Sequence, residues 1–397
     1  MMDSLLDDAA TIAALRALRP DGDTEEDIAR AAWSLIAEPG DGVAGALIAD
    51  LGAGAALRFA LDGAHGTDRL SAATERTSRA LAEARARWRP RADLRAVGDV
   101  LRAAGHVGAA LLVPGDAQWP TALDELGDHA PSVLWVRGDP GLLTAGPRVA
   151  IVGARASTGY GDHLAAELAG DLASDGAVIV SGGAYGIDGA AHRAALGVGG
   201  ATVAFLAGGV DRAYPSGHQQ LLGSIVRSGA VVSELPCGAA PTKWRFLARN
   251  RLIAALAEAT VVVEAGWRSG SLNTAGHAAA LGRPLGAVPG PVTSAASAGC
   301  HRLLREYDAR CVTSAAEVRE LWGADAAGPV VPDRGDPDQV RLGDALSTRS
   351  PRSPHDLAAR SGLTPARVIA LLGLLALEGA VVRDEGGWRA ATARERG

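Results

Sequence analysis

The pattern of apolar and polar residues divides the chain into three regions with different periodicities. In the first region, Ala, Leu and Arg recur at three- and four-residue spacing between residues 11 and 87, which is the spacing of amphipathic helices. This region carries no strand signal. The pattern therefore predicts a helical domain over residues 1–95.

From Arg148 onward, short runs of apolar, β-branched residues alternate with amphipathic, helix-length segments such as 163–172 and 219–227. The runs are nearly continuous in apolar residues, as strands buried on both faces of a parallel sheet must be. This alternation predicts an α/β fold with a doubly wound, Rossmann-like parallel sheet in an extended domain over residues 96–323. The predicted strands are RVAIVG at 148–153, AVIVSGG at 177–183, ATVAFLAGG at 201–209, AVVSE at 230–234, TVVVEAG at 260–266 and PLGAVPG at 284–290, with APSVLWVRG at 130–138 leading into the sheet.

The third region begins after a stretch rich in Pro, Gly and Asp at 324–339, which is typical of an exposed linker. The pattern then predicts a helix, a tight turn at Gly362, a second helix, and two short strands around the Asp-Glu-Gly-Gly turn at 384–387. This order of elements is typical of a winged helix, which we place at residues 340–397.

Composition and charge narrow the class of protein. The net charge is −6, so any nucleic-acid binding must depend on a local basic patch. The three cysteines show no metal-ligand spacing and indicate a reducing compartment. Asp3, Asp7 and Asp8 stand where a signal peptide needs positive charge, and the longest apolar stretch is about half of a membrane span. We expect a cytoplasmic protein without membrane insertion, cofactor or metal.

Four segments of the central domain follow the carboxyl ends of predicted strands, where doubly wound sheets bind their ligands. In the first, Gly153 lets the backbone approach a phosphate and Arg155 can hold the anion. The second, SGGAYGIDG at 181–189, opens a helix with glycines whose amides suit phosphate. Its GGxxG spacing differs from the GxGxxG of dinucleotide sites, and no acidic residue ends the following strand, so NAD is not expected.

The third segment, TKWRFLARNR at 242–251, contains four cations, two aromatic residues and no acid. Cations can hold phosphates while an aromatic face stacks a base, so this composition is typical of single-strand binding. The alternative places Phe246 in the core and Trp244 as a cap over it, with the arginines in solvent. Asn250 is expected to fix the loop by hydrogen bonds rather than to contact bases.

The fourth segment, at 264–275, places small hydroxyl side chains and a glycine at another anion-accepting helix start. Four such loops side by side predict one extended site for a polyanion. The candidate DNA-binding residues are Gly153, Arg155, Ser181, Gly182, Gly183, Ala184, Gly186, Lys243, Phe246, Arg249, Asn250, Arg251, Ser269, Gly270, Ser271 and Thr274, and no catalytic residue is proposed.

A long, ordered set of motifs covers about residues 119–312. It comprises WPTAL, APSVLWVRG, IVGARAS, SGGAYGIDGAAH, LAGGVDRAYP, SELPCG, FLARNRLIAAL, VVVEA, SGSLNTA and AVPGPV. This set resembles the DprA/Smf family of DNA-processing proteins. A helical domain before it, of the SAM or HhH type, and a winged helix after it agree with the usual arrangement of that family.

The resemblance implies a homodimer that binds and shields single-stranded DNA and helps load the recombinase RecA in natural transformation and homologous recombination, and that is not an enzyme. It places the phosphate-binding arginine on Arg155, the binding-loop lysine on Lys243 and the base-contacting aromatic on Phe246. It places the glycine-rich pocket on Ser181, Gly182, Gly183 and Gly186. The sequence departs from the family pattern at Gly183, where leucine is common, at Leu247, where proline is common, and at Asn273, where isoleucine is common.

Two other classes of function compete with this interpretation. A Rossmann-like nucleotide phosphoribohydrolase needs PGGxGTxxE, but the equivalent loop is SGSLNTAGH and lacks the glutamate that assists glycosidic cleavage. We interpret each of Asp188 and Glu264 first as a residue that caps a helix or holds its loop in place by hydrogen bonds. A ligand-sensing winged-helix regulator would need a basic face, which we do not expect. In the winged helix the basic Arg360, Arg367 and Arg383 are opposed by Asp356, Glu378, Asp384 and Glu385.

Overall fold

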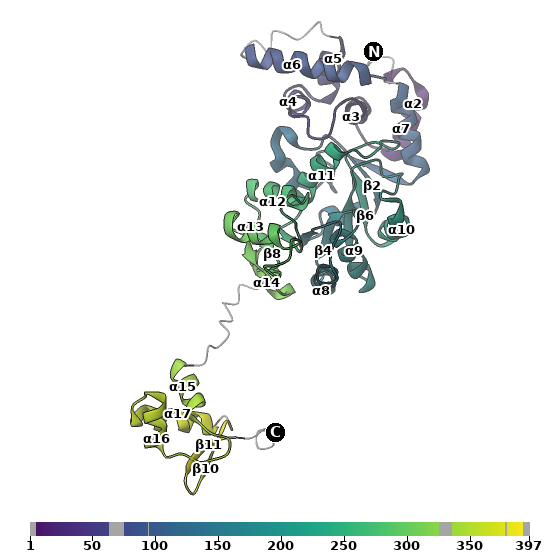
Figure 1. The fold of residues 1–397 in the computed structure, drawn as a ribbon. Coiled ribbons are helices and arrows are strands. Elements are labelled where there is room, and N and C mark those ends of the chain that lie inside the picture. Colours follow the sequence, from purple (N-terminus) through teal and green to yellow (C-terminus); the bar gives the residue numbers. More distant parts are fainter. Residues whose placement is uncertain (1–4, 63–74, 94, 325–335, 378, 392–397) are drawn as a thin grey trace. The chain divides into compact units, whose positions relative to one another are not determined.

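The computed structural model describes residues 5–62, 75–93, 95–324, 336–377 and 379–391 (Figure 1). It divides into two compact units, Met1–Asp325 and Ala326–Gly397. Most of the linker predicted at 324–339 and position 378 lie outside the described residues. The domain boundaries drawn from the sequence remain predictions.

Among the described residues, the first unit contains one nine-stranded sheet in the order β1-β2-β6-β5-β4-β3-β7-β8-β9. Across the sheet, the run β6-β5-β4-β3-β7-β8-β9 is parallel throughout. In contrast, β1 pairs with β2 and β2 pairs with β6 in antiparallel register. The strands are β1 (Ala109–Leu112), β2 (Leu134–Gly138), β3 (Arg148–Val152), β4 (Val178–Gly182), β5 (Thr202–Phe205), β6 (Ala230–Ser233), β7 (Ala259–Val262), β8 (Leu285–Ala287) and β9 (Arg310–Cys311).

The parallel part of the sheet is built outward from its middle. The chain enters at β3, adds β4, β5 and β6 on one side, and then returns to add β7, β8 and β9 on the other. The strand order therefore reverses between β3 and β7. In doubly wound sheets, ligands bind at this switch point, outside the carboxyl ends of the strands.

Helices cover both faces of the sheet, as the apolar strands require. Alternate residues of β3 show this division: Val149 and Ile151 pack in a cluster with α8 and α9, while Ala150 and Val152 pack in a second cluster with α11, α12 and α13. The helices of this part are α8 (Gly159–Ser174), α9 (Ile187–Gly197), α10 (Gln219–Ser228), α11 (Lys243–Leu256), α12 (Ser271–Ala280), α13 (Ala298–Glu306) and α14 (Ala315–Glu320), with short 3₁₀ segments at Thr121–His129, Pro140–Leu143 and Ser216–His218.

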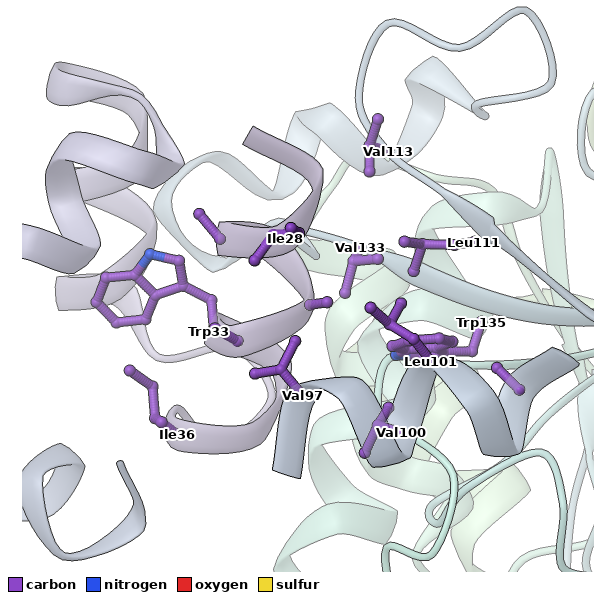
Figure 2. Packing of buried hydrophobic residues seen from close by; sticks show 14 of the residues in the cluster. Ile28, Trp33, Ile36, Val97, Val100, Leu101, Leu111, Val113, Val133 and Trp135 are labelled. Atoms are coloured by element: carbon purple, nitrogen blue, oxygen red, sulfur yellow. The ribbon is translucent and has the colours of Figure 1, made fainter. Parts of the chain in front are cut away.

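The helices before the sheet share its core. Figure 2 shows Ile28 and Trp33 of α3 in the same apolar cluster as Leu101 of α7, Leu111 of β1 and Trp135 of β2. These helices are α2 (Ala9–Leu18), α3 (Thr24–Ile36), α4 (Gly42–Leu51), α5 (Ala53–Asp62), α6 (Glu75–Trp88) and α7 (Arg95–His106), with a 3₁₀ turn at Arg89–Arg91.

Ion pairs also join the helical part to the sheet. Arg19, which caps α2, donates to Asp27 of α3 at 2.9 Å and to Asp116, after β1, at 2.9 Å. Burial of apolar surface together with these pairs makes the helical part a fixed neighbour of the sheet.

The second unit has the order of elements predicted for a winged helix. Its helices are α15 (Pro337–Ala345), α16 (Pro354–Ser361) and α17 (Pro365–Leu377), and β10 (Val381–Asp384) pairs with β11 (Gly387–Ala390) in antiparallel register. Gly362 ends α16 in the left-handed conformation, with φ of 71°. Among the described residues, no single helix is long and apolar enough to span a membrane; α16 and α17 reach that length and composition only together, across a 106° bend.

The structure confirms the predicted fold class and the seven predicted strands of the sheet. Two strands were not predicted. Ala109–Leu112 consists of Ala and Leu, which do not distinguish a strand from a helix, and Arg310–Cys311 has only two residues.

Candidate nucleic-acid interface

A cavity of about 940 Å³ opens at the switch point of the sheet. Its walls come from the segments that follow successive strands: 153–156 after β3, Ala184 after β4, Tyr214 after β5, the first half of α11 after β6, Gly266 and 268–271 after β7, and 295–296 after β8. Residues that are far apart in the sequence therefore meet because parallel strands end at the same edge of the sheet.

Most of the residues that were predicted to bind DNA line this cavity. They are Gly153, Arg155, Ala184, Lys243, Phe246, Arg249, Asn250, Ser269, Gly270, Ser271 and Thr274. The remaining five do not line it: Ser181, Gly182, Gly183, Gly186 and Arg251.

Three exposed cations line the cavity without an ion-pair partner in the part of the chain that the structure describes. Arg155, Lys243 and Arg268 are all exposed, and each comes from a different wall. Elsewhere in the same unit, arginines such as Arg19 and Arg148 are neutralised by carboxylates. Unpaired cations that converge on one cavity indicate an anionic ligand.

Phe246 forms the aromatic surface of the cavity. Its ring is half-buried, with the guanidinium carbon of Arg155 4.5 Å from the ring centroid and the ring of Tyr214 at 5.6 Å. Trp244 is 73% exposed, so it does not cap a core, and the alternative in which it covers a buried Phe246 is wrong.

Arg249 forms part of the cavity floor and is buried. Its guanidinium donates hydrogen bonds to the carbonyl oxygen of Phe205 and, at 3.2 Å, to Oδ1 of Asn250. Burial lowers the pKa of Arg249 to about 10. Burial raises the pKa of the nearby Asp188, which also lines the cavity, to about 6, while the positive charge of Arg249 opposes this rise.

Arg251 does not face the cavity. Nη2 of its buried guanidinium lies 2.8 Å from both carboxylate oxygens of Glu234, so its charge is neutralised on the other side of α11. Arg245 is likewise paired with Glu38 at 2.9 Å. Of the four cations in the basic-aromatic segment, only Lys243 is exposed and without a carboxylate partner among the described residues; its ammonium lies 5.7 Å from the centroid of the Trp244 ring.

Two polar side chains organise the loops around the cavity. Nδ2 of Asn250 donates to the carbonyl of Gly270 at 3.3 Å and to Oδ1 of Asn273 at 3.2 Å, which confirms the interpretation of Asn250 as a loop-fixing residue. The buried Glu264 accepts hydrogen bonds from the amide and hydroxyl of Thr158, at 2.8 and 2.6 Å. Asn273, one of the departures from the family pattern, thus bonds to the helix that carries Lys243.

The glycines of the second loop shape the site by close packing. A Cβ on Gly182 would lie 2.2 Å from Nη1 of Arg249, so glycine leaves the room that this guanidinium occupies. Gly186 has φ of +75°, and its Cα packs against the backbone of Ala154 and Arg155. Ser181 is fully buried and donates to the carbonyl of Ile151. These residues support the walls behind the surface that a ligand would touch.

The histidine of the second motif does not line the cavity. His192, the histidine of the second motif, is fully buried and lies outside the cavity, within hydrogen-bond distance of Thr202 and Gly182. Burial lowers its pKa to about 4. Among the described residues, no cluster of three or more His, Cys, Asp or Glu side chains is arranged to hold a metal ion.

Among the lining residues that the sequence analysis did not select, Tyr214 and Arg268 carry an aromatic ring and a positive charge. Each stands in a loop that follows a predicted strand, and this position could have marked it as a site residue. A stronger signal lies in the composition: Lys243 is the single lysine of the sequence, in which Lys and Arg together number 39. The single lysine of an otherwise arginine-based set of cations therefore stands in the basic-aromatic segment.

Known proteins with similar sequences cover most of this chain. The sequence profile of the family described as DNA recombination-mediator protein A matches residues 110–323, and that of the DprA winged helix domain matches residues 325–387. A DprA homologue of Mycobacterium tuberculosis is 46% identical over 302 residues, which is 71% of this chain and 77% of the homologue. The DNA processing protein DprA of Bacillus subtilis is 36% identical over 56% of this chain and 74% of its own length.

Solved structures agree with these similarities. DprA from Streptococcus pneumoniae, at 36% identity, superposes with a TM-score of 0.52 over 60% of this chain and 84% of its own. DNA processing protein A from Helicobacter pylori, whose structure is described as showing a unique single-stranded DNA binding mode, is 33% identical with a TM-score of 0.50 over 54% of this chain and 95% of its own. On these similarities the chain belongs to the DNA recombination-mediator protein A (DprA) family.

Proposed function

We propose that this protein binds single-stranded DNA in the cavity at the switch point of the sheet. The observation that carries the proposal is that three exposed cations, Arg155, Lys243 and Arg268, line the same cavity as the half-buried ring of Phe246 and have no ion-pair partner among the described residues. Phosphates need the cations and an unstacked base needs the ring, and a single strand offers both. The single-stranded DNA binding described for the Helicobacter pylori relative supports the proposal.

We assign roles in this binding to five of the lining residues. Lys243 and Arg155 hold phosphates from two walls, and Phe246 stacks a base. Hydroxyls at the amino end of α12, such as Ser269 and Ser271, offer hydrogen-bond donors to the backbone of the strand. The base of a duplex is not available for this stacking, so single strands are preferred.

The resemblance to the family extends the proposal to the cell. We infer that the protein is cytoplasmic, works as a homodimer, shields single strands and helps load RecA in natural transformation and homologous recombination. We also infer that the site holds its ligand without cutting it, because α12 lacks a glutamate one turn into the helix. These inferences depend on the family resemblance and await tests of their own.

The proposal is tested by fluorescence anisotropy of labelled single- and double-stranded oligonucleotides at several salt concentrations. Lys243→Gln and Arg155→Gln should each weaken single-strand binding for all sequences, and each should reduce the slope of log affinity against log salt by about 0.7. Arg227→Gln is the matched control, because Arg227 is exposed at the end of α10 next to the amino end of β6.

The control variant should bind as the wild type does. Unchanged affinity and salt slope in both Lys243→Gln and Arg155→Gln would refute the proposal. Nucleoside monophosphates are assayed in parallel for release of the base, because Asp188, with its raised pKa, lines the same cavity. Turnover that is lost in Asp188→Asn would favour the phosphoribohydrolase alternative.

A further inference from the structure

The largely exposed aromatic residues of the first unit lie in or near the sequence segments that supply the cavity lining. In the part of this unit that the structure describes, the largely exposed aromatic residues either line the cavity or stand within four residues of a lining residue in the sequence. They are Tyr160, Tyr185, Tyr214, Trp244 and Trp267. Aromatic residues are only 4% of the sequence, and exposing one forgoes apolar burial, so an exposed aromatic side chain next to a lining residue is a candidate ligand contact.

Trp267 is placed most clearly to receive such a ligand. It lies between Gly266 and Arg268, which both line the cavity, yet its own side chain lies outside and is 56% exposed. The guanidinium carbon of Arg302 is 5.4 Å from the centroid of its ring. Arg302 is held in turn by Glu306 at 2.7 Å. The indole is therefore braced from one side by an anchored cation and open to solvent elsewhere.

The neighbouring Arg268 supplies the second half of a nucleotide subsite. It is exposed, lines the cavity, and has no ion-pair partner among the described residues. An exposed cation beside an exposed, braced indole is the combination that binds one phosphate and one base.

We propose that Trp267 and Arg268 form a further nucleotide subsite, on which a single strand continues after it leaves the cavity. Arg268 holds the phosphate at the rim, and the base of the next nucleotide stacks on the open part of the Trp267 ring. This inference depends on the proposed single-strand binding. It adds that the bound segment is longer than the cavity itself and follows the loop between β7 and α12.

The test measures affinity against strand length for the full chain and for two substitutions of the same residue. The probes are labelled thymidine oligonucleotides of about 2 to 16 nucleotides, which bracket the site sizes of single-strand-binding folds. Trp267→Leu keeps an apolar side chain without a π face, and Trp267→Phe keeps the π face. Val198→Ala is the control for loss of exposed apolar surface, because Val198 lies at the end of α9 remote from the cavity.

In Trp267→Leu, affinity for the long oligonucleotides should fall by roughly tenfold, the order of magnitude of one lost base stack, while affinity for the shortest ones stays unchanged. Trp267→Phe should retain most of the long-strand affinity, and Val198→Ala should retain all of it.

The inference and the proposed function fail in different ways. If the wild type binds no single strand of any length, the proposed function is wrong. If the wild type binds single strands and Trp267→Leu binds every length as tightly as the wild type does, the subsite is refuted. The exposed indole would then be a candidate contact for a protein partner. An equal loss at all lengths would also refute the subsite, because Trp267 would then act on the cavity.

Discussion

At the scale of single residues, the site depends on which charges are left free. Within one stretch of ten residues, Arg245, Arg249 and Arg251 are committed to protein partners, whereas Lys243 faces the cavity unpaired. The local sequence does not show that the three arginines of this stretch are held by protein partners. Lys243, the single lysine of the sequence, is the one of these four cations that the tertiary structure leaves available to a ligand.

Lys243→Arg should not preserve wild-type binding. The lysine ammonium is a compact charge with three rotatable donors, whereas guanidinium is planar and prefers to stack or to bind in a bidentate manner. Affinity for single strands should therefore fall below that of the wild type, while the salt slope, which counts neutralised phosphates, stays unchanged. Anisotropy titrations at several salt concentrations measure both quantities, and Lys243→Gln, in which the slope falls, is the comparison. Full affinity in Lys243→Arg would show that only the charge matters.

Two buried groups beside the cavity should give opposite pH dependences of stability. Burial lowers the pKa of His192 from 6.5 to about 4, so the unfolded chain binds a proton first and the folded state loses stability as the pH falls through this range. Burial raises the pKa of Asp188 from 3.8 to about 6, so its contribution is present below pH 3.8 and is lost as the pH rises through 6.

The two contributions offset each other in the wild type, and substitution should separate them. In His192→Gln, the free energy of unfolding should rise relative to wild type by about 3 kcal/mol as the pH falls from 6.5 to 4. In Asp188→Asn, it should fall relative to wild type over nearly the same range. Urea denaturation at a series of pH values measures both differences. Parallel curves for the wild type and His192→Gln would show that His192 does not titrate abnormally.

At the scale of elements, α11 is the helix that connects the site to the rest of the first unit. Its start is held by the ion pair between Arg245 and Glu38, which follows α3, and its middle by the pair between Arg251 and Glu234. Its polar residues Arg249, Asn250 and Arg251 are buried, so the helix has no exposed polar face in that stretch. An amphipathic pattern is therefore missing, and the sequence shows only a basic-aromatic run.

The Arg251–Glu234 pair should contribute to stability and not to DNA binding. Glu234→Gln leaves a buried guanidinium without its counter-charge, whose Nε and Nη1 already lack hydrogen-bond partners, and should destabilise the fold by about 3 kcal/mol. The double substitution Arg251→Met with Glu234→Met should regain most of this loss, because it removes both charges.

Thermal denaturation measures the stability of these variants, and anisotropy measures their binding. Where the variants are folded, the salt slope for single-strand binding should equal that of the wild type, since Arg251 lies outside the cavity. A reduced salt slope in the double variant would show that Arg251 contacts DNA, as the sequence analysis predicted.

At the scale of the whole molecule, the residues that line the cavity come from the first unit. The cavity is lined by residues between Val152 and Ala296. In the second unit, the helix that follows the winged-helix turn, α17, exposes Ile369, Leu374 and Leu377, and its Arg367 is paired with Asp336 and Asp338. Strong duplex binding needs free cations on such a helix.

A chain that ends at residue 325 should therefore bind single strands with the affinity and salt slope of the full chain. The full chain should in turn gain no duplex affinity from its second unit. Anisotropy with matched single- and double-stranded oligonucleotides measures both, with circular dichroism to show that the shortened chain is folded. A loss of single-strand affinity on shortening would assign part of the binding surface to residues 326–397.

The sequence alone determined the class of fold, because strands buried on both faces must be apolar throughout and the helices between them must be amphipathic. It also located the four loops of the site, because parallel strands present their carboxyl ends at one edge. Neighbours in the sequence cannot show which side of α11 a guanidinium faces. Only the tertiary structure paired Arg251 with Glu234, buried Arg249 under Gly182, and brought Arg268 and Tyr214 to the cavity, because these contacts join segments that are distant in the chain.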